Sequence, residues 1–245
     1  MHLPAVIFDL DGTLIDSAPD IHAASNAVLA EHGFAPLSLP QVRSFVGRGV
    51  PHLVDCLLAA SGEDPQGALH ARMVAAFSAR YEEAVALTEV YPGVPEALRA
   101  LAEAGHLLGI CTNKPLAPTR AVLAHLGLDG FFGTVIGGDS LPTRKPDPAP
   151  LLHAVDRIGR PRAIFVGDSE VDAETARAAG LPFLLFTEGY RKTPVQDLPH
   201  SAVFSDFAQL PGLVAGCETA DMPYRPALQT PYQGNADKEA SNAQT

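Results

Sequence analysis

The sequence predicts an α/β protein in which a parallel β-sheet is covered by helices on both faces. Two observations support this fold class. Short apolar segments recur along the chain, and each ends in Gly, Asp, Ser or Thr and is followed by a segment of helical periodicity. After the first of these segments comes a long stretch with amphipathic helical stripes and no convincing strand. The chain therefore combines a sheet domain with an all-helical insert.

The predicted strands are the most apolar of these segments. They span residues 5–10, 107–111, 163–166 and 183–186, with further strands at 134–136 and 202–204. Continuous apolar runs of this length are typical of parallel strands that are buried on both faces. We therefore expect a core domain formed by residues 1–15 and 88–215.

The helical insert is expected at residues 16–87. Gly33 stands where its first helix would end. Three apolar stripes lie at helical spacing: Ile21, Ala24, Val28 and Leu29; Leu53, Leu57 and Leu58; and Leu69, Met73, Phe77 and Tyr81. Beyond the core domain, residues 216–245 contain Pro, Asn and Gln without apolar periodicity. Such a segment cannot offset its conformational entropy by burial, so we expect a disordered tail.

The composition argues against several classes of protein. A formal net charge of -11 disfavours nucleic acid and anionic membranes as partners, because both attract basic surfaces. No stretch approaches the roughly 18 consecutive apolar residues of a membrane span, and no basic segment precedes the first apolar run. The three cysteines show no CxxC spacing, which predicts free thiols. We expect a cytoplasmic monomer or homodimer.

The first predicted strand ends in two acidic residues, Asp9 and Asp11. Side chains alternate along a strand, so both carboxylates point the same way, at the carboxyl end where open parallel sheets hold ligands. Two buried carboxylates repel each other unless a cation or a shared proton intervenes. Mg²⁺ favours such carboxylates together with phosphate oxygens and water. Taken alone, the segment could equally be a surface Asp-x-Asp-Gly turn.

Three further groups of polar residues follow predicted strands in order. Thr112 and Asn113 offer a hydroxyl and an amide to phosphate oxygens, although an ordinary strand-to-helix loop has the same composition. Lys145 precedes a proline and could be a solvated turn residue. Asp168 follows a strand and suits a metal, whereas Asp172 could support that metal or cap the next helix. Their shared placement at strand ends favours a single site.

At these residues the chain resembles the haloacid dehalogenase-like phosphatases. Their four motifs match FDLDGT at residues 8–13, Thr112, Lys145 and GDSEVD at residues 167–172, and the resemblance covers about residues 4–210. It implies a Rossmann-like doubly wound parallel core, with a small all-helical cap domain that is inserted after the first strand, closes over the site and selects the substrate.

The resemblance also implies a role for each motif residue. Asp9 would be the nucleophile, and Asp11 would protonate the leaving oxygen and then activate water. Mg²⁺ would be held by Asp9, by Asp11 through its backbone carbonyl, and by Asp168. The residues expected to bind phosphate or substrate are Thr13, Thr112, Asn113 and Lys145. A carboxylate nucleophile divides one difficult displacement into two easier ones, which agrees with this assignment.

Four segments resemble the phosphoglycolate phosphatases in particular: FDLDGTLIDSAPD, CTNKP, VIGGDSLPTRKPDPAPLL and FVGDSEVDAETARAAG. This likeness implies a small phosphorylated metabolite, 2-phosphoglycolate, as the substrate. Asp11 argues against a carbon-halogen dehalogenase, and the lack of lysine in residues 16–87 argues against a phosphonate-cleaving enzyme. A sugar-phosphate mutase and another small-metabolite phosphatase stay as alternatives. A phospho-aspartate receiver or a catalytically silent binding protein are alternatives of a different class.

One arginine of the insert, Arg48, lies between two glycines. We hypothesise that this loop lies over the site and that Arg48 or its neighbouring amides bind the carboxylate of a small substrate. A flexible surface turn with a solvated arginine is the alternative.

Overall fold

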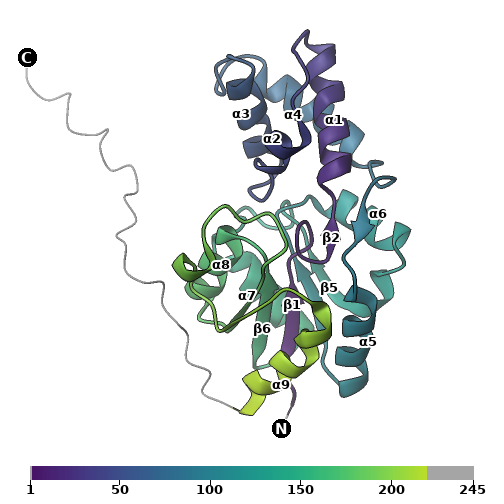
Figure 1. The fold of residues 1–245 in the computed structure, drawn as a ribbon, viewed down its shortest axis with the longest axis vertical. Coiled ribbons are helices and arrows are strands. Elements are labelled where there is room, and N and C mark those ends of the chain that lie inside the picture. The colour runs from purple at the N-terminus through teal and green to yellow at the C-terminus, as the bar shows by residue number, and fades with distance from the viewer. Residues whose placement is uncertain (1, 220–245) are drawn as a thin grey trace, which may run out of the picture.

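The computed structural model describes residues 2–219 of the chain. It contains a sheet domain and a bundle of helices that lies beyond the ends of the strands, at the top of the view (Figure 1). The predicted α/β class is confirmed by six parallel strands in the order β5-β4-β1-β6-β7-β8. The strands are β1 (Ala5–Phe8), β4 (Leu108–Cys111), β5 (Phe132–Ile136), β6 (Ala163–Gly167), β7 (Phe183–Phe186) and β8 (Ala202–Phe204).

The first strand is shorter than predicted. β1 ends at Phe8 because the chain turns at Leu10, whose carbonyl accepts hydrogen bonds from the backbone N–H groups of Thr13, Leu14 and Ile15. The turn places Asp9 directly after the strand and carries Asp11 into the loop beyond it.

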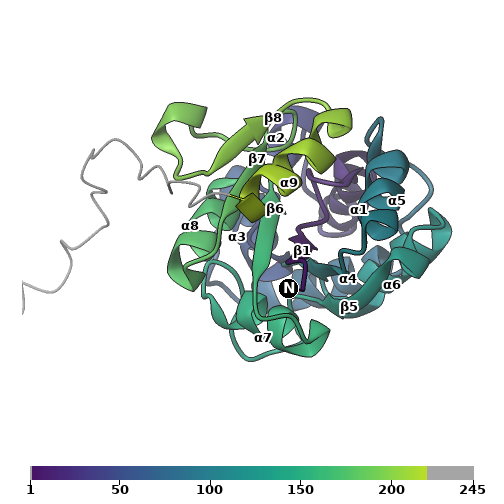
Figure 2. The same ribbon diagram turned by 90° about the horizontal axis from the view of Figure 1, so that it is seen from below.

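Helices cover both faces of the sheet, as expected for a doubly wound fold. Val6 and Phe8 of β1 pack in the apolar cluster that includes α5 (Val94–Ala104), α6 (Leu116–His125) and α9 (Leu210–Thr219). Ala5 and Ile7 point to the other face, toward α7 (Ala149–Ile158) and α8 (Glu170–Ala179). The view from below shows these helices on either side of the strands (Figure 2). Alternation along one strand therefore divides the core into two layers.

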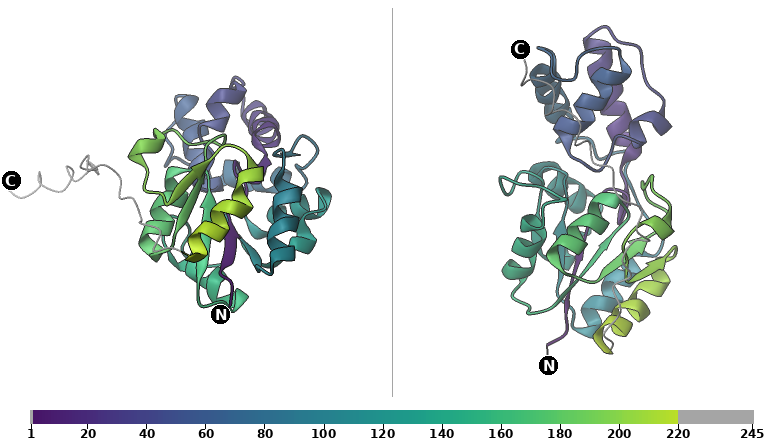
Figure 3. Two further views of the ribbon diagram at one scale, coloured as in Figure 1. Left: turned by 60° about the horizontal axis from the view of Figure 1, so that its bottom comes forward. Right: turned by 90° about the vertical axis from the view of Figure 1, so that its left-hand side faces the viewer.

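The helical insert has an apolar core of its own. Its helices are α1 (Ala18–Glu31), α2 (Leu39–Arg43), α3 (Val50–Ala60) and α4 (His70–Tyr81). All three predicted stripes contribute to this core, with Leu69 at its margin. The chain enters the insert through β2 (Ile15–Asp16) and leaves it through β3 (Glu89–Val90), and these two strands pair antiparallel. The insert is thus joined to the sheet domain by one short two-stranded ribbon (Figure 3).

The final helix corrects the predicted start of the tail at residue 216, because α9 continues to Thr219. Leu210, Leu213, Val214 and Cys217 recur at helical spacing and pack against the sheet. This apolar spacing crosses the predicted boundary. The rest of the expected tail, residues 220–245, lies outside the described residues. Among the residues that the structure describes, no helix has the length and apolar character needed to span a membrane.

Candidate active site

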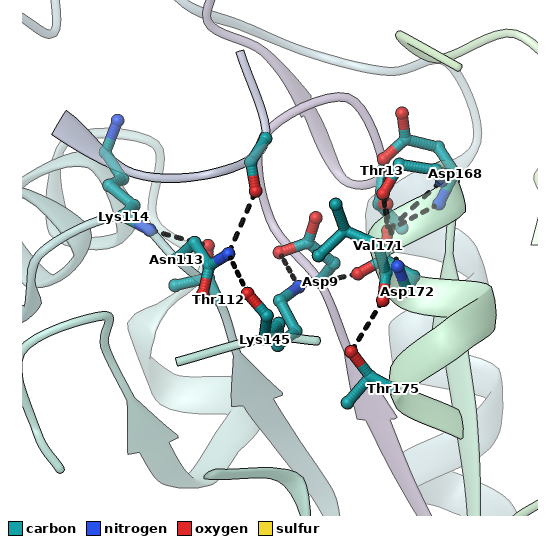
Figure 4. A network of polar contacts seen from close by, with 12 residues as sticks. Asp9, Thr13, Thr112, Asn113, Lys114, Lys145, Asp168, Val171, Asp172 and Thr175 are labelled. Atoms are coloured by element: carbon teal, nitrogen blue, oxygen red, sulfur yellow. Dashed lines mark hydrogen bonds and ion pairs between the residues drawn. The ribbon is translucent and has the colours of Figure 1, made fainter. Parts of the chain in front are cut away.

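The polar residues predicted from the sequence lie together at the carboxyl ends of three adjacent strands (Figure 4). Asp9 follows β1, Thr112 follows β4 and Asp168 lies at the end of β6. Lys145 reaches the same place from the segment between β5 and α7. Adjacent parallel strands have their carboxyl ends on the same side of the sheet, which is where open α/β sheets hold their ligands.

Asp9, Asp168 and Asp172 form a buried carboxylate cluster, with one oxygen of each lying within 4.8 Å of the others. The ammonium group of Lys145 lies 2.8 Å from Asp9 Oδ1 and 2.6 Å from Asp172 Oδ1. Lys145 is also buried, so both ion pairs are shielded from water. Three carboxylates and one ammonium leave two negative charges when all four groups are ionised.

The protonation of this cluster is dominated by burial and mutual repulsion. Burial, assisted by the charge of Asp172, raises the pKa of Asp9 to about 7, although Lys145 opposes the shift. Burial and the charges of Asp172 and Asp9 also raise the pKa of Asp168 well above its ordinary value. Burial lowers the pKa of Lys145, but Asp172 and Asp9 outweigh it and raise the pKa overall. The cluster therefore favours a bound cation whenever its carboxylates are ionised.

The donor set fits a divalent cation. Three carboxylates in one buried pocket supply the hard oxygen ligands that Mg²⁺ prefers, and their excess of two negative charges is the charge that one such ion neutralises. Two of the predicted ligands, Asp9 and Asp168, belong to this cluster, and Asp172, whose role the sequence left open, is its third member. The backbone carbonyl of Asp11 stays a predicted ligand.

Asp172 caps the following helix and also belongs to the carboxylate cluster. Ser169 and Asp172 form a capping box at the start of α8, in which Asp172 Oδ2 accepts hydrogen bonds from the Ser169 backbone N–H and hydroxyl. Its other oxygen, Oδ1, accepts from Lys145. Gly167 makes this possible because a Cβ atom there would lie 2.6 Å from the Asp172 side chain. The helix cap thus fixes the orientation of a site carboxylate.

Asp168 is held from two sides. Thr13 Oγ1 donates to Asp168 Oδ1 at 2.8 Å, and the backbone N–H of Tyr190 donates to Oδ2 at 2.6 Å. Thr13 is fully buried, and its hydroxyl contacts this carboxylate. This corrects the prediction that Thr13 binds phosphate: in the structure it orients Asp168. Gly189 approaches closely, since a Cβ there would lie 2.3 Å from Asp168 Oδ2.

Asp11 points away from the carboxylate cluster, toward the insert. Its Oδ1 accepts hydrogen bonds from Ser17 Oγ at 2.6 Å and from Lys114 Nζ at 3.2 Å. Lys114 Nζ also donates to the hydroxyl of Tyr81, on α4, at 2.5 Å. Lys114 is buried, which lowers its pKa, whereas Asp11 opposes this shift. The lysine of the CTNKP segment had no predicted role.

The loop after β4 places Thr112 and Asn113 differently from each other. Thr112 Oγ1 accepts from the Lys114 backbone N–H at 3.2 Å, which leaves the hydroxyl proton available to a ligand. Asn113 Nδ2 donates to the carbonyl oxygens of Gly47, at 3.0 Å, and of Lys145, at 2.9 Å. Both amide protons are used within the protein. The side chain of Asn113 thus links the insert to the core, while the residue also lines the cavity, and its phosphate contact stays a prediction.

A cavity that is partly open to solvent lies between the insert and the carboxyl end of the sheet. Asp9, Asp11, Thr112 and Lys114 line its core side. The insert side is mainly apolar and comprises Ile21, Phe45, Val46, Val50, Leu53 and Phe77, together with Tyr81 and two glycines. A mainly apolar lining with a few placed polar groups is typical of sites for small molecules.

Arg48 does not line this cavity among the described residues, although Gly47 and Gly49 do. Its side chain is exposed, and its charge acts on His52 of α3, where burial and then Arg48 lower the pKa of the imidazole. The loop thus lies where the sequence suggested, but the arginine points elsewhere. The hypothesis that Arg48 contacts the substrate is not supported by this arrangement.

Comparisons with known proteins agree with this geometry. The chain matches the haloacid dehalogenase-like hydrolase family over residues 3–180. It is 57% identical over 213 residues to phosphoglycolate phosphatase of Rhodobacter capsulatus, covering 87% of this chain and 97% of the relative. Identity to the phosphoglycolate phosphatase of Rhodospirillum rubrum is 46%, with 84% and 88% covered.

A solved structure shares the fold. The crystal structure of a predicted phosphoglycolate phosphatase from Haemophilus somnus superimposes with a TM-score of 0.81 at 29% identity, covering 87% of this chain and 98% of that one. The family resemblance deduced from the four motifs is confirmed by the match over residues 3–180.

Proposed function

Because the chain belongs to the haloacid dehalogenase-like hydrolases and is a phosphoric monoester hydrolase, we propose that it converts 2-phosphoglycolate to glycolate and phosphate with Mg²⁺ as cofactor. The observation that carries this proposal is the position of Asp9. It lies in the carboxylate cluster beside Lys145 and also lines the cavity under the insert.

In the first step, a carboxylate oxygen of Asp9 attacks the phosphorus atom, and the bond between phosphorus and the ester oxygen breaks. Lys145 lies 2.8 Å from Asp9 and can neutralise negative charge on the transferred group. The hydroxyl of Thr112, on the same cavity wall, can donate to a phosphoryl oxygen. The product of this step is an aspartyl phosphate on Asp9.

Asp9, Asp168, Asp172 and the backbone carbonyl of Asp11 are the groups proposed to hold Mg²⁺, either directly or through water. When bound, the ion supplies Lewis-acid stabilisation of the phosphoryl oxygens and keeps Asp9 ionised. The pKa of Asp9, raised to about 7, supports this proposal. A nucleophilic carboxylate must be deprotonated at the pH at which it reacts, and a bound cation would keep Asp9 ionised near neutral pH.

Asp11 manages the proton in both steps. It gives a proton to the leaving alkoxide and then takes one from the water that attacks the aspartyl phosphate, so that the bond from phosphorus to Asp9 breaks and free phosphate leaves. Ser17 and Lys114 both contact Oδ1 of this carboxylate and therefore fix its rotation at the cavity wall. Asp9 and Asp11 thus have different surroundings and different tasks.

The cavity supports a small acidic substrate over a sugar phosphate. Lys114 is a buried cation on its wall and can pair with a substrate carboxylate while the phosphate lies at Asp9. The apolar side chains contributed by the insert offer few partners to the hydroxyl groups of a sugar, which would be left unpaired on burial. Two related expectations also stay proposals: a cytoplasmic location, and a monomeric or homodimeric state.

The test is phosphate release from 2-phosphoglycolate, ethyl phosphate and glucose 6-phosphate, each with Mg²⁺ and with a chelator. We expect Mg²⁺-dependent release that is fastest with 2-phosphoglycolate. Conversion of one sugar phosphate into its isomer without release of phosphate would instead identify a mutase. Metal binding without turnover of any ester would identify a binding protein.

A further inference from the structure

The first helix of the insert begins without its expected cap. Ser17 occupies the N-cap position of α1, and serine at this position usually accepts a hydrogen bond from the helix backbone. Here its side chain makes no such bond, and its backbone, at φ -97° and ψ -1°, lies in the helical region rather than the extended region typical of caps. The Ser17 hydroxyl is instead donated to Asp11 Oδ1 at 2.6 Å.

A tyrosine that is distant in sequence, Tyr190, binds the backbone at the start of this helix. The phenol oxygen of Tyr190 accepts hydrogen bonds from the backbone N–H groups of Ser17, at 2.9 Å, and Ala18, at 3.0 Å. It donates its own proton to Asp16 Oδ1 at 2.6 Å. The first N–H groups of a helix have no partner within the helix, so a buried helix start requires such an acceptor.

We propose that Tyr190 is a positioning residue for the reaction: by accepting from the N–H groups of Ser17 and Ala18 it holds the Ser17 backbone where the Ser17 hydroxyl reaches and orients Asp11. The inference rests on the role proposed above for Asp11. The same tyrosine donates its backbone N–H to Asp168 Oδ2, so one residue contacts the metal-site carboxylate directly and the proton-transfer carboxylate through Ser17. Neither contact involves the substrate.

The loop that carries Tyr190 is fixed to both parts of the molecule. Glu170 of α8 accepts hydrogen bonds from the backbone N–H groups of Lys192 and Thr193, at 2.6 and 2.5 Å. On the insert side, the guanidinium group of Arg43 lies 4.8 Å from the centre of the Tyr190 ring and donates to the Gly189 carbonyl at 3.2 Å. These contacts hold the phenol at the junction between the insert and the sheet domain.

Removing the phenol oxygen should loosen the backbone that carries the Ser17 hydroxyl. In Tyr190→Phe, the Ser17 N–H loses its acceptor, and the Ala18 N–H keeps only Asp16 Oδ1, at 3.2 Å. A shift of the Ser17 backbone moves its hydroxyl away from Asp11. The ring and the backbone N–H to Asp168 are retained in this variant, which isolates the effect of the phenol oxygen.

The experiment compares Tyr190→Phe, Ser17→Ala and the double variant by their kcat and KM for phosphate release with Mg²⁺. A lost hydrogen bond to a charged group corresponds to about a ten-fold fall in kcat, which we expect in each single variant, with KM changed less than about two-fold. Because both residues act through the same contact, the double variant should be no slower than the slower single variant. Ser17→Thr keeps the hydroxyl and should recover most of the kcat lost in Ser17→Ala.

Ser25→Ala provides the matched control. Ser25 lies in the same helix, is buried, and its hydroxyl has no hydrogen-bond partner among the described residues. The kcat of Ser25→Ala should equal that of the wild type. An unchanged kcat in Tyr190→Phe, or losses that multiply in the double variant, would overturn the proposal. A wild-type enzyme that releases no phosphate from any ester would instead contradict the proposed function. If Tyr190→Phe failed to fold, equal activity of Ser17→Ala and the wild type would still overturn the proposal.

Discussion

The sheet domain and the helical insert contribute to the same cavity in opposite ways. The sheet domain supplies buried charge: three carboxylates of the cluster and Lys145 are almost inaccessible to water. The insert supplies an apolar wall, and Tyr81 is its main polar contact to the core cation Lys114. Under the proposed function, the core would cleave the ester bond and bind the substrate carboxylate through Lys114, and the insert would disfavour substrates whose polar groups its apolar wall leaves unpaired.

The two regions also differ in how tightly their side chains are constrained. Removing one partner of a buried ion pair costs about 3–5 kcal/mol, because the remaining charge is left unpaired. Exchange of one apolar side chain for another of similar volume usually costs less than about 1.5 kcal/mol. Changes to the insert should therefore alter specificity while the fold is kept, whereas loss of Lys145, which pairs with Asp9 and Asp172, should lower both activity and stability.

The largest effect should come from Asp9→Asn. An amide cannot form the aspartyl phosphate, so we expect kcat to fall by on the order of 1000-fold or more, as for other nucleophile replacements. Thermal unfolding should show a Tm equal to or above that of the wild type, because one of three repelling carboxylates is removed. Circular dichroism serves as the control for folding. Turnover close to the wild-type rate would show that another group attacks phosphorus.

The next effect concerns stability as a function of pH. The pKa of Asp9 is raised from its ordinary value of 3.8 to about 7, so the folded state binds this proton more tightly than the unfolded state does. This contribution to stability is complete below pH 3.8 and is lost as the pH rises through about 7. In chelator, the Tm should fall by on the order of 5 °C between pH 5 and pH 8.

Mg²⁺ should reduce that fall, because it binds the ionised carboxylates. Asp9→Asn is the control, and its Tm in chelator should depend less on pH. A wild-type Tm in chelator that rises with pH more steeply than that of Asp9→Asn would contradict the assignment. The measurement is differential scanning calorimetry across this pH range with and without Mg²⁺.

A smaller effect separates substrate selection from chemistry. Lys114→Met keeps most of the length of the side chain and removes the cation proposed to bind the substrate carboxylate. We expect the KM for 2-phosphoglycolate to rise by about 10–100-fold, and the KM for ethyl phosphate, which has no carboxylate, to change much less. Lys192→Met, at an exposed lysine, is the matched control. Equal changes in KM for both substrates would mean that Lys114 acts only by contacting Asp11 and does not bind the substrate carboxylate.

The smallest effect is expected for Arg48→Ala. The side chain is exposed and lies outside the cavity, so kcat and KM for 2-phosphoglycolate should stay within about two-fold of the wild type. Steady-state kinetics measure this directly. A large rise in KM would mean that the loop turns inward when substrate binds, and would restore the original hypothesis for this residue.

The sequence predicted the fold and part of the site because those features are periodic or lie at strand ends. Buried parallel strands appear as continuous apolar runs, and Asp9, Lys145 and Asp168 follow them in order. Adjacency in a parallel sheet then brings together residues that are far apart in sequence. The three apolar stripes of the insert were recognisable for the same reason, since helical spacing marks the face that packs.

The sequence could not predict the direction in which loop side chains point. Asn113 and Arg48 lie in loops next to the cavity. The side-chain amide of Asn113 donates both protons to backbone carbonyls, whereas the side chain of Arg48 faces solvent. Tyr190 contacts Ser17 across 173 positions of sequence, and no periodic pattern marks such a contact. Lys114 had a local signal in CTNKP, but its contact with Tyr81 depends on how the insert packs over the core.

The two strands that join the insert to the core have a consequence for how such enzymes can diversify. Because β2 and β3 pair with each other, the points of entry and exit lie one strand spacing apart, about 4.8 Å. Any folded segment whose ends lie that close together can be grafted at this junction without altering the order of the main sheet. The architecture therefore permits an exchange of entire lids by recombination, while the catalytic scaffold is inherited unchanged.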